Sequence, residues 1–284
     1  MASILILVLV ILLGFLYFEN SILSTSNYEI YFDGLPKCFD GYKIVHLSDL
    51  HNKLFGRNQE RLVEAIKKAK PDMIAITGDL VDRRHYREDV SMILIKECIK
   101  IAPVYFVTGN HEWWSGKYEG LELKLQAQGV MILDDRSRII HRDNEWIYII
   151  GIDDAAKNIP KYGGKKEQEI LKETLETALK DTQRERFRIL LSHRPEKMDL
   201  YESTEVDLVL SGHVHGGQWR IPGMGGLLAP GQGFFPEYDG GLYHKGKTTM
   251  VISRGLGNSI IPIRLFNRPE IVIITLKSEQ NREN

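Results

Sequence analysis

A carboxylate and an imidazole, Asp49 and His51, follow a short run that begins at Lys43 and contains β-branched residues. If this run is a strand and its exit stays extended, residues two apart point to the same side, so both side chains would face one point. Oxygen and nitrogen ligands placed side by side suit a divalent metal ion of intermediate hardness. One such pair is weak support for a metal site, because short polar pairs at strand ends are usually solvated loop residues.

Four later runs of apolar residues also end in side chains that can bind a metal. The runs are 73–77, 103–107, 187–191 and 206–210, and the side chains that follow them are Asp79, Asn110, His193, His213 and His215. Helical patterns at 62–69 and 92–101 separate the first three runs, which predicts strands of an α/β sheet, where ligands bind beyond the strand ends. With Asp49 and His51 these are seven donors, too many for one tetrahedral ion, and two ions that share Asp79 would use them all.

In their order, these motifs resemble the calcineurin-like metallophosphoesterases. The motifs are Asp-x-His at 49–51, Gly-Asp at 78–79, Gly-Asn-His-Glu at 109–112, a histidine at 193 and Gly-His-x-His at 212–215. The resemblance runs from about residue 42 to the C-terminus, and it includes the segments 216–218, 253–257 and 267–270. These segments look like the membrane-associated bacterial phosphodiesterase branch, similar to UDP-2,3-diacylglucosamine pyrophosphatase-like phosphoesterases. Glu112 departs from the aspartate of many relatives, which could change the support of the neighbouring His111.

This resemblance implies an α/β fold in which two mixed β-sheets pack face to face and are flanked by helices, a four-layer sandwich. It implies two metal ions, one held by Asp49, His51 and His215, the other by Asn110, His193 and His213, with Asp79 as the bridge. A metal-bridging hydroxide would attack phosphorus in line, and His111 would act as the general acid for the leaving alkoxide. Mixed oxygen and nitrogen ligands suit Mn, Fe or Zn, with Mn favoured.

The N-terminal segment from Ala2 to Phe18 carries no charge and would form a helix of about 26 Å, marginally a membrane span. It lacks a basic region and a small-x-small cleavage signature, which favours an uncleaved single-pass anchor in the cell membrane over a removed signal peptide or a buried core element. We therefore divide the chain into an anchor at 1–22, a linker and edge strand at 23–41, and a catalytic domain at 42–284. The linker itself is expected at 21–27.

Several other features have two interpretations. Arg254 and Arg264 could bind a substrate phosphate or form structural ion pairs. The Gly- and Pro-rich stretch 216–241 is expected to be a long loop, whose apolar side chains either pack on the sheet or contact acyl chains and the membrane surface. Ordinary roles are expected for a solvated turn at 82–85, a hairpin at 138–150 with His141 at its surface, turn caps at 153–154, and free thiols at Cys38 and Cys98.

The net charge of −1 gives the 284-residue chain no global basic face, so nucleic acid is not an expected partner. The sequence predicts a membrane-anchored, metal-dependent phosphohydrolase. A phosphodiesterase is favoured, acting on phosphoester or pyrophosphate bonds of a lipid-linked or nucleotide-bearing substrate. The alternatives are a phosphomonoesterase acting on nucleotides or proteins, and a non-catalytic metal-binding scaffold. The natural substrate, the side of the membrane and the oligomeric state do not follow from these patterns.

Overall fold

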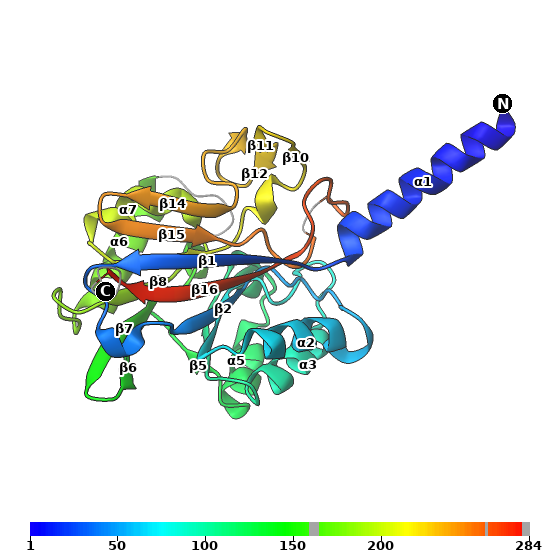
Figure 1. Ribbon diagram of the computed structural model, residues 1–284. Coiled ribbons are helices and arrows are strands. Elements are labelled where there is room, and N and C mark those ends of the chain that lie inside the picture. The colour runs from blue at the N-terminus through cyan, green and yellow to red at the C-terminus, as the bar shows by residue number, and fades with distance from the viewer. Residues whose placement is uncertain (159–164, 259–260, 280–284) are drawn as a thin grey trace.

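The structure is a computed structural model that describes residues 1–158, 165–258 and 261–279. Two six-stranded mixed sheets form its centre (Figure 1). The first sheet has the order β1 (Ser24–Phe32), β16 (Glu270–Ser278), β2 (Lys43–Leu47), β3 (Met73–Thr77), β4 (Val104–Val107) and β5 (Met131–Ile132). The second has the order β14 (Gly241–Lys245), β15 (Thr248–Ile252), β9 (Leu208–Ser211), β8 (Arg188–Leu191), β7 (Glu145–Gly151) and β6 (Arg136–Arg142).

Strands buried on both faces hold the two sheets together. In β3, Met73 and Ala75 belong to the apolar layer between the sheets, whereas Ile74 and Ile76 belong to the layer under the helices. Side chains that alternate in this way let one strand serve two cores, which explains its continuous apolar run. The predicted fold of two mixed sheets packed face to face and flanked by helices is therefore confirmed.

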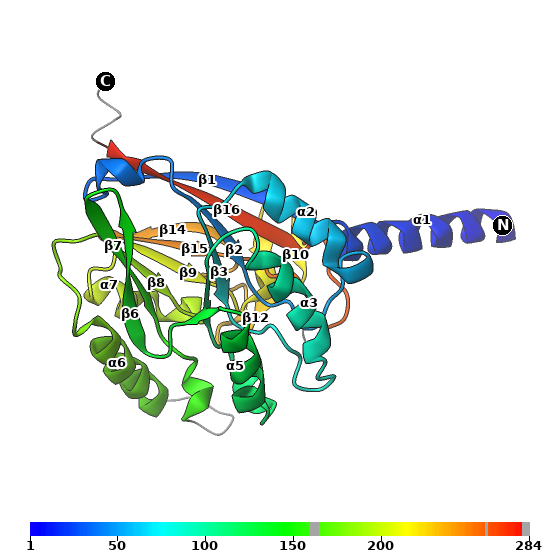
Figure 2. The ribbon, with the colours of Figure 1, turned by 90° about the horizontal axis from the view of Figure 1, so that it is seen from below.

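Helices cover the outer face of each sheet (Figure 2). The first sheet carries α2 (Glu60–Ala69), α3 (Glu88–Cys98) and α5 (Tyr118–Ala127), and the second carries α6 (Lys165–Leu179) and α7 (Met198–Ser203). Leu62 and Ile66 of α2 are fully buried one helical turn apart, as an amphipathic stripe requires. Pro71 follows the end of this helix, where its missing N–H and fixed φ prevent the helix from continuing.

The edge strand β1 begins within the segment that the sequence analysis expects to be the linker. It begins at Ser24 and pairs in parallel with β16 along its whole length, so the expected linker at 21–27 was wrong for residues 24–27. Its first residues alternate between half-buried and exposed positions, because an edge strand needs only one sheet neighbour. The serine-rich composition of residues 21–27 suggested a loop, whereas the backbone of residues 24–27 pairs with β16.

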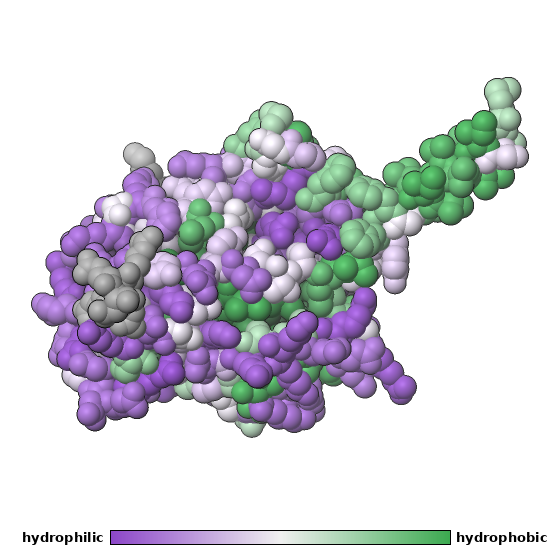
Figure 3. Space-filling view, viewed as in Figure 1, coloured by the Kyte–Doolittle hydropathy of each residue, from purple (hydrophilic) through white to green (hydrophobic). Residues whose placement is uncertain are grey.

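One apolar helix, α1 (Ala2–Ser21), projects from the body of the domain (Figures 1 and 3). Its mean hydropathy is 2.6, and within the described residues it is the one helix long and apolar enough to cross a membrane. Its side chains are exposed along most of its length, so it does not contribute to the core of the domain.

The smaller expected features are also present. Strands β6 and β7 form the predicted antiparallel hairpin, on which His141 is exposed. Cys38 is half-buried, Cys98 is buried, and both are free thiols. The stretch 216–241 is mostly loop with four two-residue strands: β10 (Arg220–Ile221), β11 (Gly225–Gly226), β12 (Leu228–Ala229) and β13 (Gly233–Phe234). We call residues 218–235 the apolar lobe.

Candidate metal centre

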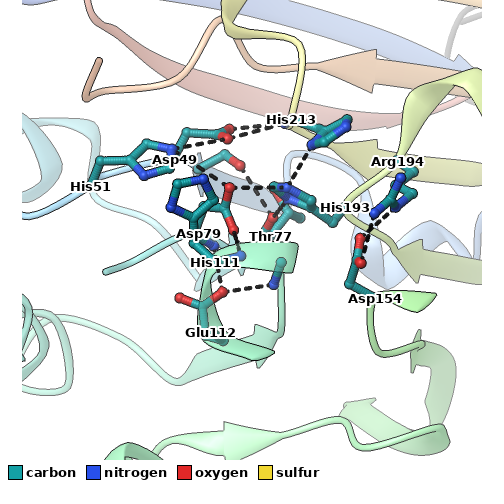
Figure 4. Close-up of polar contacts among 12 residues, drawn as sticks. Asp49, His51, Thr77, Asp79, His111, Glu112, Asp154, His193, Arg194 and His213 are labelled. Carbon is teal, nitrogen blue, oxygen red and sulfur yellow. Dashed lines mark hydrogen bonds and ion pairs between the residues drawn. The ribbon is translucent and has the colours of Figure 1, made fainter. Parts of the chain in front are cut away.

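The predicted ligands lie where strands of both sheets end (Figure 4). Strands β2, β3 and β4 are neighbours in the first sheet, and β8 and β9 are neighbours in the second. Their exits supply Asp49, His51, Asp79, Asn110, His193, His213 and His215, all of them buried. The sheet packing thus brings together residues up to 166 positions apart in the chain (215 − 49 = 166).

A first cluster consists of Asp49, His51 and His215. The Nε2 atoms of His51 and His215 are 3.1 Å apart. Asp49 Oδ1 lies 3.4 Å from Nε2 of His215 and 3.8 Å from Nε2 of His51. One carboxylate oxygen and two imidazole nitrogens therefore converge on a single point, as ligands of one cation would.

A second cluster consists of Asp79, His193 and His213. His193 Nε2 lies 3.1 Å from His213 Nδ1 and 3.4 Å from Asp79 Oδ2. The same Asp79 oxygen is 3.6 Å from Nε2 of His51 in the first cluster. Asp79 therefore stands between the two clusters, where a bridging ligand would stand.

Asn110 gives an independent test of whether these residues suit metal ions. Its Oδ1 atom is buried and finds no hydrogen-bond partner within the described part of the chain. A buried polar oxygen without a partner is costly, and a cation would satisfy it. The donor set of carboxylate, amide oxygen and imidazole fits a divalent ion of intermediate hardness.

The backbone reaches this geometry in an unexpected way. Strand β2 ends at Leu47, and Asp49 and His51 have φ values of 53° and 45°, so the expected extended alternation was the wrong reason for their convergence. Asp79, His213 and His215 are left-handed too, at 53°, 70° and 49°. Conformations of this kind cost about 1 to 3 kcal/mol each for residues other than glycine and gather at functional sites.

Glycines let these exits approach one another. Gly78 has a φ of 87°, and a Cβ atom there would overlap the backbone of Gly109 in the neighbouring exit. A Cβ atom on Gly212 would overlap the side chains of Ser48 and Asp49. The glycines that precede Asp79 and His213 are therefore required by close packing.

Hydrogen bonds orient the ligands. The Nδ1–H of His193 donates to the Thr77 carbonyl over 2.7 Å, which leaves Nε2 free to bind a metal. The backbone N–H of His213 donates to the Asp49 carboxylate over 3.0 Å, so the exits of β2 and β9 are joined through a ligand. Thr77 had no predicted role, because the sequence does not reveal which carbonyl a histidine will meet.

Charge in the site favours cations. Burial alone would raise the pKa of Asp79, but the neighbouring His193 imidazole holds it well below its usual range. Burial lowers the pKa of His215 to about 3, so this imidazole is neutral and has a free lone pair at neutral pH. Two buried carboxylates beside the neutral His215 imidazole form a site that attracts divalent cations.

His111 lies beside the clusters, and its two nitrogens have different surroundings. Its Nδ1 accepts the backbone N–H of Arg83 over 3.2 Å, so the neutral ring carries its proton on Nε2. Burial lowers the pKa of His111 to about 4. The ring centroid is 4.5 Å from that of His51 and 6.1 Å from that of Trp114. A neutral imidazole with an N–H next to a metal site can donate to a phosphate oxygen.

Two carboxylates support the site in ways that the sequence did not reveal. One carboxylate oxygen of Glu112 accepts the backbone N–H groups of Asp79 and Gly109 at 2.7 and 2.8 Å, and the other accepts those of Leu80 and Val81. Asp82 caps the expected turn but also lies 3.8 Å from His51 Nδ1 and 3.7 Å from His111 Nδ1. The position of Asp82, three residues after Asp79, is the feature of the sequence that could have indicated a role in the site.

The predicted caps and arginines have structural partners. Asp154 accepts the N–H of Ala156 as a turn cap and also binds Arg194 through two hydrogen bonds. Arg254 pairs with Glu270 at 2.8 Å, which agrees with the structural interpretation of this residue. Arg264 is fully buried and donates to backbone carbonyls of Arg254, Gly257 and Asn267. Its guanidinium lies 3.5 Å from Nδ1 of His215, one of the predicted ligands.

Comparisons with known proteins agree with this geometry. The family described as calcineurin-like phosphoesterase matches residues 42–217. The chain is 31% identical to the uncharacterized metallophosphoesterase YkuE of Bacillus subtilis, over 92% of this chain and 88% of that protein. It is 32% identical to a Danio rerio transmembrane protein with metallophosphoesterase domain, over 88% of this chain but only 56% of that protein's length.

Solved structures show a looser likeness. Phosphopantetheinyl hydrolase from Mycobacterium tuberculosis is 12% identical, with a TM-score of 0.47 over 75% of this chain and 89% of that one. A superposition at that level does not bear on the substrate. The family assignment rests on the sequence relatives, whose names state a metallophosphoesterase and no substrate.

Proposed function

Because the chain belongs to the calcineurin-like phosphoesterase family, a class of hydrolases, we propose that it is a membrane-anchored phosphodiesterase that works with two divalent metal ions. The main support is the position of Asp79, whose Oδ2 lies 3.6 Å from His51 Nε2 in one cluster and 3.4 Å from His193 Nε2 in the other. A carboxylate between two sets of ligands is what a pair of ions requires.

The seven ligands divide between two ions in this proposal. Asp49, His51 and His215 would hold one ion, His193 and His213 together with Asn110 would hold the other, and Asp79 would serve both. When bound, the ions supply the positive charge that activates a water and stabilises the phosphoryl oxygens. The mixed donor set suits Mn, Fe and Zn alike, and of the three we propose Mn.

We assign His111 as the general acid that protonates the leaving oxygen. The Arg83 N–H occupies its Nδ1, so the proton available to the reaction is on Nε2. From there the imidazole can donate to the departing alkoxide and regain a proton from solvent. Asp82, close to both His111 and His51, keeps a negative charge beside the two rings.

Contacts at the end of α1 support an uncleaved anchor. Glu19 is buried, and its carboxylate accepts the backbone N–H of Asn267 over 2.8 Å. Asn20 binds the backbone of Arg264 through both its amide oxygen and its amide nitrogen. Cleavage after residue 22 would leave these backbone groups without their partners.

The first experiment measures metal content and turnover of the full chain in detergent. We expect about two metal ions per chain and, with added Mn, faster hydrolysis of bis-p-nitrophenyl phosphate than of p-nitrophenyl phosphate. Asp79→Asn should lose paired metal binding, whereas Asp181→Asn, an exposed aspartate, should lose neither metal nor activity. Metal without turnover of either ester would favour the scaffold alternative, and faster turnover of the monoester would favour a phosphomonoesterase.

A second experiment tests the anchor. We expect the full chain to sediment with membranes, to need detergent for release, and to yield peptides from residues 1–22 by mass spectrometry. Recovery in the soluble fraction without detergent, or a mature N-terminus near residue 22, would contradict the anchor without affecting the hydrolase assignment.

A further inference from the structure

The end of α1 is bound to a loop of the domain, residues 261–268. The buried Glu19 and the amide of Asn20 bind the backbone of Asn267 and Arg264. Phe15 contacts Phe266 with ring centroids 5.4 Å apart. The direction in which α1 leaves the domain is therefore set by several contacts and not by a flexible linker.

The same loop holds the apolar lobe. Trp219 Nε1 donates to the Ile263 carbonyl over 2.9 Å, and the backbone N–H of Arg220 donates to the Leu265 carbonyl over 2.9 Å. Gln218 Nε2 donates to the Ile261 carbonyl over 2.6 Å. Lobe, loop and helix end thus form one connected unit, on the side of the domain from which α1 emerges (Figure 1).

This side of the domain exposes large apolar side chains. Phe234 is 71% exposed, Met224 67%, and Phe235 58%. The others are Trp219, Ile221, Leu228, Ile263 and Phe266. In Figure 3 hydrophobic residues cover the lobe and the loop beside α1, along the upper edge of the view. Apolar patches of this extent on a folded domain mark contact surfaces.

The bilayer is the occupant that the position of this surface favours. A helix that spans a membrane brings the side of the domain from which it emerges to the headgroup region. Two arginines lie at the end of α1: Arg61 donates to the Ser21 carbonyl, and the Arg268 guanidinium lies 5.2 Å from the Phe18 ring centroid. Cations at the end of an apolar helix, next to exposed aromatic rings, suit a lipid–water interface.

The surface is also joined to the metal centre. The lobe begins three residues after His215, and the Asn267 side chain donates to the carbonyls of His215 and Gln218 over 2.7 and 3.0 Å. We propose that the apolar lobe and the 261–268 loop rest in the headgroup region of the bilayer that holds α1, so that the substrate is a phosphodiester carried by a membrane lipid. The substrate part of this proposal rests on the proposed function, whereas the membrane contact does not.

Fluorescence quenching tests the contact directly. The full chain is placed in vesicles of phosphatidylglycerol and phosphatidylethanolamine with brominated acyl chains, which quench tryptophan emission on contact. Phe234→Trp and Met224→Trp should each add emission that is quenched by roughly half. Leu123→Trp is the matched control, because Leu123 is 68% exposed but lies on α5, away from the lobe. Equal quenching at positions 234, 224 and 123 would overturn the membrane contact, and so would an absence of quenching at the two lobe positions. If the lobe bound a protein partner instead of the bilayer, no quenching would be expected at positions 234 and 224.

Turnover tests the substrate. Two probes with the same leaving group are compared: the p-nitrophenyl phosphodiester of a diacylglycerol in vesicles, and bis-p-nitrophenyl phosphate in solution. The double variant Phe234→Ser with Phe235→Ser should turn over the lipid probe about tenfold more slowly and the soluble probe at an unchanged rate. Leu123→Ser should change neither rate. Equal loss on both probes, or no loss on either, would contradict a lipid substrate, and a wild-type chain inactive on both would instead count against the hydrolase assignment.

Discussion

His111 is a buried imidazole next to the ligands but outside both clusters, and this position determines what its removal should do. His111→Ala should retain both metal ions and lose about two to four powers of ten in rate, because a general acid is lost while the ligands stay. The loss should be greatest for an alkyl diester, whose leaving group needs the proton most. Metal analysis and kcat with alkyl and p-nitrophenyl diesters check this. His141→Ala, on the exposed hairpin, is the control, and full activity of His111→Ala on the alkyl diester would refute the assignment.

A second histidine, His46, makes the stability of the fold depend on pH. It is fully buried in β2, its Nε2 lies 2.8 Å from Thr77 Oγ1, and burial lowers its pKa to about 4. The unfolded chain takes up a proton near pH 6.5 and the folded chain does not, so stability is present above about pH 6.5 and is lost as the pH falls toward 4.

His46→Gln isolates this effect. Between about pH 7 and pH 5, the parent chain should lose about 2 kcal/mol more of its free energy of unfolding than the variant does. Urea unfolding in detergent at both pH values measures the difference, with the exposed His141→Gln as the control. Identical losses in parent and variant would mean that His46 titrates alike in the folded and unfolded chains.

At the scale of elements, the short helix α4 (Asn110–Trp114) holds two strand exits in register. Its Glu112 accepts four backbone N–H groups, three of them from the exit of β3 and one from that of β4. Glu112→Gln replaces an acceptor oxygen by a donor that faces these N–H groups. We expect a loss of about 2 kcal/mol in stability and weaker metal binding, because Asp79 lies in the exit that moves.

Thermal unfolding and metal titration measure both effects. Glu119→Gln provides the control, since Glu119 is an exposed glutamate on the neighbouring α5. A Glu112→Gln chain as stable as its parent would show that the two exits are held by the glycine contacts alone.

Residue types and order predicted the main strands and pointed to candidate ligands, six of which the structure brings into two clusters, but they did not predict how the backbone presents them. Runs such as 73–77 predict buried strands because apolar residues on both faces must be covered. The left-handed backbone of Asp49 and His51 depends on packing against Gly212 and its neighbours, which no local pattern records. The structural role of Arg264 could not be predicted either. Its side chain is buried and donates to backbone carbonyls, and only the folded chain brings those carbonyls together.

At the scale of the whole molecule, the end of α1 and the candidate metal centre both contact the 261–268 loop. The backbone N–H of Asn267 donates to the Glu19 carboxylate, and its side-chain amide donates to the His215 carbonyl. Arg264 is bound by Asn20 and lies 3.5 Å from His215 Nδ1. The last residues of α1 are therefore part of the support for His215, the proposed metal ligand, as well as the end of the proposed anchor helix.

Two deletions separate these roles. Deletion of residues 2–18 removes the apolar helix but keeps Glu19 and Asn20, so it should release the chain from the membrane with metal content and turnover of bis-p-nitrophenyl phosphate intact. Deletion of residues 2–22 also removes the partners of Asn267 and Arg264, and we expect metal affinity to fall by about 10- to 100-fold, as it does when residues that orient a ligand are lost. Metal titration of both chains is the measurement. If the two deletions bind metal alike, the end of α1 serves as a tether alone, because the loop then holds His215 without it.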